Sequence, residues 1–160
     1  MKMRLETDLS LFNNGMIQVK SAVVVGSKAG MQQAMEEFRE DAFTIPPTVP
    51  YKDGALKEAH EIRVESVLGG VRGMLEVVEV RQAASLHEGI SRHGTPYKKW
   101  TTPGSGSHWL SSKLLMFKDE YVRKVAAGIR QAFRIIKVRG HFRHFGTTWV
   151  QPHLRKIRIR

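Results

Sequence analysis

Apolar residues recur at helical spacing in a stretch near the start of the chain, from Met16 to Ala42. Four of them repeat every seven positions, with three others beside them: Ile17, Val24, Met31 and Phe38, then Ala34, Met35 and Ala42. An apolar stripe of this kind predicts a long amphipathic helix. The β-branched run at 23–25, with Gly26 and Gly30 after it, lowers helix propensity and favours a break at these glycines.

A second stretch, from about His108 to Lys137, has the most continuous apolar stripe in the sequence. Its members step mostly by three or four positions: Leu110, Leu114, Phe117, Tyr121, Val125, Ile129, Ala132 and Ile136, widened by Trp109, Val122 and Phe133. Ser107 precedes the stripe, and a serine side chain can accept hydrogen bonds from the first free N–H groups of a helix. We therefore predict a long C-terminal helix that Ser107 caps.

Two runs of strand-forming residues lie between the predicted helices, at Glu61–Leu68 and Met74–Val80. Gly69, Gly70 and Gly73 separate them, and glycine adopts the positive φ of hairpin turns at little steric cost. The sequence therefore predicts a β-hairpin. Its second run is apolar on both faces, which suits the centre of a sheet or a sheet packed between a helix and a subunit neighbour.

Shorter elements are expected around the hairpin. Three prolines exclude a helix from residues 44–53, and a turn is expected at Asp53-Gly54. A single helical turn follows at Gly54–His60, and Gln82–Gly89 is expected to form another short helix. At the start of the chain, the alternation in Met3–Leu9 is typical of a half-buried edge strand.

Together these elements predict an α+β fold. Its small antiparallel sheet contains a central hairpin, flanked by a long N-terminal helix and a long C-terminal helix. The 160 residues have the usual size of one domain, and they are enough to bury a core. We expect a single domain over residues 1–137 and a basic C-terminal arm over residues 138–160.

Aromatic residues outside the predicted core mark candidate contact surfaces. The stretch Ile90–Ser107 has the composition of a loop, and a loop of this length is usually functional or mobile. It carries Tyr97 and Trp100, which either fold back on the domain or contact a neighbour on assembly. The arm carries further large aromatic side chains, among them Phe142, Phe145 and Trp149. We expect the loop and the arm to contact other subunits or partners.

Positive charge is concentrated at the C-terminal end. Of 26 Lys and Arg residues, 15 precede residue 121, where they equal the 15 acidic residues, and the other 11 follow with no acid among them. Such asymmetry predicts an anionic partner for this end, either nucleic acid or acidic protein, and a merely solvated basic face is the alternative. The candidate contacts lie in the arm: Arg139, Arg143, Arg155, Lys156, Arg158 and Arg160.

Residues of catalytic or ligand type form no recognisable constellation in the sequence. His141, His144 and His153 cluster, but without nearby carboxylates or a known ligand spacing, so phosphate or interface contacts are favoured over a metal site. His87 and Glu88 follow Ser85 closely, yet no third group that would orient them is identifiable. We therefore expect no enzyme activity and no cofactor.

Other functional classes are excluded by composition. The chain has no cysteine, so it has neither a disulfide framework nor a thiolate metal site. No apolar run approaches the roughly 20 residues that a membrane-spanning helix needs. The first ten residues lack the apolar core of a signal peptide, and we expect a protein made in the cytoplasm.

The order of motifs resembles the tail-completion proteins of long-tailed bacteriophages, a family also described as minor capsid, neck or head–tail joining proteins. The similarity covers about residues 1–137 and includes a P-x-D-T-G-A-L-like motif, an H-E-G segment and the opening of the last helix. The matching residues are Val49, Pro50, Asp53, Gly54, Ala55 and Leu56, then Ala83 or Ala84, His87, Glu88 and Gly89, then Trp109 and Leu110. The basic arm has no counterpart in the pattern.

This resemblance implies a structural, non-enzymatic subunit of the virion neck, made in the host cytoplasm. Such subunits form a homo-oligomeric ring, commonly a hexamer, that joins the head connector or stopper to the tail tube or tail terminator. No cofactor and no membrane are implied. The ring surrounds the DNA channel, so a neck role and DNA contacts of the basic arm are compatible. His87 and Glu88 are then expected at a subunit or partner interface. The alternative is a nucleic-acid-binding protein that uses this arm.

Overall fold

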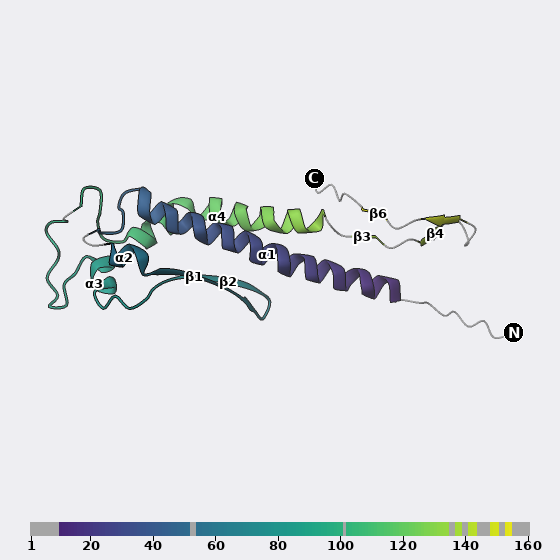
Figure 1. Cartoon of the computed structure of the whole chain (residues 1–160), viewed down its shortest axis with the longest axis horizontal. Coiled ribbons are helices and arrows are strands. Elements are labelled where there is room, and N and C mark those ends of the chain that lie inside the picture. The colour runs from purple at the N-terminus through teal and green to yellow at the C-terminus, as the bar shows by residue number, and fades with distance from the viewer. Residues whose placement is uncertain are drawn as a thin grey trace.

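Two long helices and a β-hairpin make up most of the structure, a computed structural model (Figure 1). It describes residues 10–51, 54–100 and 102–134, and the backbone of four short strands between residues 137 and 154. The main elements are α1 (Ser10–Thr44), β1 (His60–Val67), β2 (Gly70–Val77) and α4 (Trp109–Phe133). The helices run antiparallel, and the hairpin packs against α1 (Figure 1). The predicted α+β fold is thus confirmed.

Glycines hold α1 and α4 in close contact. A Cβ atom at Gly128 of α4 would lie 2.7 Å from the Cα atom of Gly30 and 2.5 Å from the carbonyl oxygen of Gly26. Only hydrogen fits between backbones at that distance. The predicted break at Gly26 and Gly30 is therefore wrong, since α1 is continuous and packing offsets the low helix propensity of its glycines.

The buried side of α1 follows a four-residue step through Gly26, Gly30, Ala34, Phe38 and Ala42. The three last-named residues belong to the predicted stripe, and all three are buried. Two other stripe members remain exposed, Ile17 at 64% and Val24 at 45%. Both lie on the side of α1 opposite Gly26, the residue that meets Ile129 and Ala132 of α4, so neither faces α4. The N-terminal part of α1 also extends past the end of α4 (Figure 1).

The hairpin turns at two residues, Leu68 and Gly69, because Val67 pairs with Gly70. Gly69 adopts a φ of +85°, a conformation that favours glycine. Gly73, expected in the turn, instead lies inside β2, where a Cβ atom would come within 2.8 Å of methionine side chains of α1. This glycine lets the strand lie directly on the helix. Within the described residues β1 is the only strand that pairs with β2, so β2 does not lie at the centre of a larger sheet. The hairpin packs on α1, and cover of its other face by a neighbouring subunit stays a prediction.

The proline segment after α1 is tied to α4 by a buried lysine. The Lys113 side chain has no exposed surface, and its Nζ donates to the Pro47 carbonyl at 3.0 Å and the Ser112 Oγ at 3.3 Å. Burial lowers the pKa of Lys113, while Asp41 opposes that shift. The Pro46–Pro47 peptide bond is cis. The segment also pairs through Thr48, whose N–H donates to the Gly104 carbonyl at 2.9 Å.

The short elements agree with the sequence in place and type. Helix α2 (Ala55–Glu58) and helix α3 (Ala83–Glu88) lie where helical turns were predicted. The prediction that Ser107 caps α4 is wrong, because His108 occupies the N-cap position with a φ of +57°. The predicted strand Met3–Leu9 lies outside the described residues.

Short strands pair within the arm. Strand β3 (Lys137–Val138) pairs with β6 (His153–Leu154), and β4 (His141–Arg143) pairs with β5 (Thr148–Val150), both antiparallel.

Replacing Gly128 by alanine is expected to destabilise the protein. The added methyl group meets backbone atoms of α1 that cannot move independently, and overpacking of this kind costs about 1–3 kcal/mol. The matched control is Gly15→Ala in α1, where a Cβ atom meets nothing within 4 Å. It should be neutral or stabilising by up to about 1 kcal/mol. Urea unfolding of both variants checks this, and equal stability of the two would contradict the close helix contact.

The buried imidazole of His60 is expected to make stability fall on acidification. Its Nδ1 donates to the Leu56 carbonyl at 2.7 Å, and burial lowers its pKa below the ordinary value. The unfolded chain therefore takes up this proton first, and unfolding becomes favoured as pH falls below about 6.5. His60→Gln keeps an N–H donor but has no proton to gain. Between pH 7.5 and 5.5 the unfolding free energy of His60→Gln, measured by urea unfolding, should fall less steeply than that of the native chain. Equal pH dependence of the two would contradict the lowered pKa of His60.

Candidate functional site

An apolar groove of about 610 Å³ lies between β2 and α4, with α1 as its floor. Met31, Met35 and Phe38 line it from α1. The α4 side contributes apolar residues over four helical turns, and Gly73 and Leu75 of β2 form the opposite wall. The groove exists because the hairpin and α4 both pack on α1 and make little contact with each other.

Large apolar side chains of α4 continue from the groove onto the open surface. Leu114 is 54% exposed and Val122 is 65% exposed, although both belong to the stripe predicted to be buried. Leu115 and Met116 lie next to Leu114 in sequence and are exposed as well, at 78% and 57%. Successive residues of a helix are about 100° apart, so Leu114, Leu115 and Val122 lie within one sector of α4, whereas Met116 lies on the side opposite Leu114. Exposed apolar surface of this kind marks interaction sites on soluble proteins. We call Leu114, Leu115 and Val122 the α4 apolar face.

A second exposed apolar surface lies in the N-terminal half of α1. Ile17 and the run Val23–Val25 are exposed there. In the part of the chain that the structure describes, both long helices thus carry exposed apolar side chains. The sequence pattern missed both surfaces, because it shows that side chains are apolar and does not show which turns of a helix another element covers.

Polar contacts fix the register of α4 at the deep end of the groove. Tyr121 donates from its hydroxyl to the Asp41 carboxylate at 2.8 Å, and its ring packs edge-on against Phe38. Burial and this hydrogen bond raise the pKa of Tyr121 far above its ordinary value, so the phenol stays protonated. One turn further on, Lys124 forms an ion pair with Glu37 at 3.0 Å. Two acidic residues near the C-terminal end of α1 are therefore engaged by α4.

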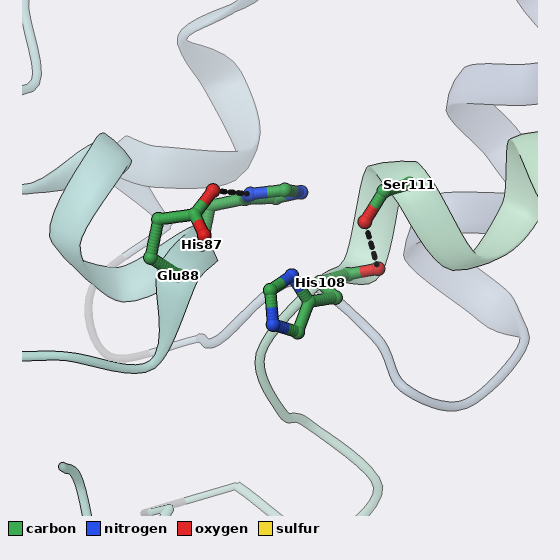
Figure 2. A network of polar contacts seen from close by, with 4 residues as sticks. All are labelled: His87, Glu88, His108 and Ser111. Carbon is green, nitrogen blue, oxygen red and sulfur yellow. Dashed lines mark hydrogen bonds and ion pairs between the residues drawn. The ribbon is translucent and has the colours of Figure 1, made fainter.

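His87 and Glu88, two of the predicted interface residues, lie on α3 at one end of the groove. The His87 ring packs edge-on against the buried Trp109, 4.9 Å between centroids, and also lines the groove. Its Nδ1 is 3.2 Å from the Glu88 Oε1 (Figure 2). His108 lies beside them, with its ring centroid 5.6 Å from that of His87.

The donor atoms of His87, Glu88 and His108 all lie within 4.8 Å of one another, and these residue types are metal ligands. Sequence reasoning found no third group for His87 and Glu88. Their partner is His108, at a distance of 21 positions from His87, and only the folding of α4 against α3 brings it near.

The predicted contact residues of the loop lie together. Tyr97 and Trp100 have ring centroids 5.6 Å apart, and Tyr97 remains 37% exposed. The loop is anchored to the domain by its backbone, since the N–H of Tyr97 donates to the Gly89 carbonyl at 2.9 Å. The role of Tyr97 and Trp100 at an interface stays a prediction.

The predicted residues of the arm are only partly described. The backbones of Phe142 and Trp149 pair across β4 and β5, and Arg143 pairs with Thr148. The other predicted arm residues lie outside the described part of the chain: Phe145, Arg139, Arg155, Lys156, Arg158 and Arg160. The contacts expected of the basic side chains stay predictions.

No protein-family model matches the chain, and no curated protein or solved structure matches it. Within the described residues, no helix is both long enough and apolar enough to span a membrane.

Proposed function

We propose that the chain is a structural subunit of the neck of a long-tailed bacteriophage. In this proposal, copies of the chain form a hexameric ring at the head–tail interface of the virion. The ring joins the head connector or stopper to the tail tube or tail terminator and so completes the tail. The role is one of assembly, without catalysis.

The observation that carries this proposal is the exposed apolar surface of the two long helices. A monomer that buries only a small core while leaving Leu115, Met116 and Val122 more than half exposed has surface to cover by association. The groove beside this surface adds concave apolar walls that an element of a neighbouring subunit can fill.

Residues that carry the family resemblance lie together in the fold. Val49, Leu56, Ala83 and Trp109 come from three separate motifs, and all four belong to one buried cluster, together with Ala42. Motifs spread over 61 positions thus meet in a single core. This supports the proposal because motifs whose residues form one core together specify a fold, whereas isolated short motifs do not.

A second candidate function, nucleic-acid binding, is favoured by the distribution of charge. The last 40 residues carry 11 Lys and Arg and no acid, whereas the preceding 120 residues are balanced. The two functions are compatible, because a neck ring surrounds a channel through which DNA passes.

Leu115→Glu is expected to prevent assembly without unfolding the chain. The side chain is 78% exposed, so a carboxylate is tolerated in the monomer but not in a covered apolar contact. Analytical ultracentrifugation should show the native chain as a ring-sized oligomer and the variant as a monomer with an unchanged circular dichroism spectrum. The matched control, Leu68→Glu at the exposed hairpin tip, should still assemble.

A native chain that stays monomeric and does not co-sediment with phage heads or tails would contradict the neck proposal. Equal loss of assembly in the Leu68→Glu control would contradict the assignment of the contact to the α4 apolar face.

Removal of the arm's terminal charge is expected to abolish DNA binding if the second function holds. The variant replaces Arg155, Lys156, Arg158 and Arg160 with glutamine. Fluorescence anisotropy with duplex DNA should show affinity of the native chain that falls steeply with salt, because each neutralised phosphate releases counterions. The variant should bind weakly with a smaller salt slope. Absence of binding by the native chain at low salt would contradict this function.

A further inference from the structure

We propose that His87, Glu88 and His108 form a binding site for a divalent transition metal ion such as Zn²⁺, with three protein ligands. Their ligand atoms all lie within 4.8 Å of one another (Figure 2). Two imidazoles and one carboxylate make a known zinc ligand set that leaves a coordination position open. This inference does not rest on the proposed neck function, since a single copy of the chain supplies all three ligands.

The spacing of the first two ligand atoms already suits a metal. The His87 Nδ1 and the Glu88 Oε1 are 3.2 Å apart. Ligand atoms at about 2.0–2.1 Å from a tetrahedral Zn²⁺ are separated by roughly 3.3 Å, so the separation of this pair is close to that of two zinc ligands. Glu88 and His108 are exposed, so their side chains are free to turn toward the ion.

The backbone holds the two segments that carry the ligands. The N–H of His108 donates to the carbonyl of His87 at 2.6 Å, which joins the start of α4 to α3. The His87 ring is fixed against Trp109, which has no exposed surface. Gly89 closes α3 with a φ of +73°, and a Cβ atom there would lie 2.8 Å from the Cβ atom of Ser107. The backbones of both segments and the His87 ring are therefore positioned before any ion arrives, and only the exposed Glu88 and His108 side chains need to turn.

The ligand types select the class of metal. Imidazole nitrogen suits Zn²⁺, Ni²⁺, Cu²⁺ and iron, whereas Mg²⁺ and Ca²⁺ prefer oxygen ligands. One carboxylate offers too few oxygens for either of the latter ions. Without a metal, the His87 Nδ1 and the exposed Glu88 carboxylate are within hydrogen-bond distance, at 3.2 Å.

The test is isothermal titration calorimetry of the full chain with Zn²⁺ alone at pH 7.5. The protein used for the titration has His141, His144 and His153 replaced by alanine, so that the histidines of the arm cannot bind the metal. We expect one Zn²⁺ per chain and no binding of Mg²⁺. Glu88→Gln and His108→Asn should each weaken Zn²⁺ binding by more than about tenfold. Loss of a residue that only hydrogen-bonds to a metal ligand already weakens binding by about tenfold, and these two variants remove a ligand itself. Asparagine suits position 108 because it tolerates a positive φ.

The matched control is His93→Asn, which replaces an exposed histidine of the neighbouring loop and should leave Zn²⁺ affinity unchanged. Co²⁺ in place of Zn²⁺ gives a second readout, because its visible absorption is intense in four-coordinate sites and should be lost in Glu88→Gln. Circular dichroism establishes that each variant is folded. Absence of Zn²⁺ binding, or affinity that neither Glu88→Gln nor His108→Asn changes, would overturn the proposal.

Discussion

The close contact between α1 and α4 at their glycines is the constraint on which the rest of the structure depends. Gly26 and Gly30 on one helix and Gly128 on the other let the two backbones touch. This contact sets the register of the helices, which the bonds of Tyr121 to Asp41 and of Lys124 to Glu37 then match. A small displacement at the glycines would separate all of these partners, because interiors packed at this density do not deform gradually.

The same contact explains why apolar surface remains open. Because α4 and the hairpin both pack on α1 and scarcely on each other, the space between them becomes a groove. The buried residues concentrate in two small clusters, while apolar side chains elsewhere on both helices remain exposed. A chain of this shape can bury more apolar surface by association, which is the physical reason for the assembly role that we propose.

The start of α4 is where segments distant in sequence meet. Lys113 reaches back to the Pro47 carbonyl, Trp109 fills the core beside Ala83, and His108 lies against His87. Each of these contacts follows from the position of one helix end. The juxtaposition of two histidines and a carboxylate there is thus a consequence of core packing, and it uses residues that the core itself does not need.

The sequence by itself determined the class and order of the elements, because helical and strand periodicity are local properties of side chains. It predicted the hairpin, both long helices and the short helix at His87, and it identified the charge asymmetry of the last 40 residues. It did not determine the role of Gly26 and Gly30, since low helix propensity is local whereas close packing depends on a partner helix. Exposure of Leu114 and Val122, burial of Lys113 and the meeting of His108 with His87 were likewise decided only by tertiary structure. Each depends on which distant segment covers a given turn, and periodicity carries no information about that.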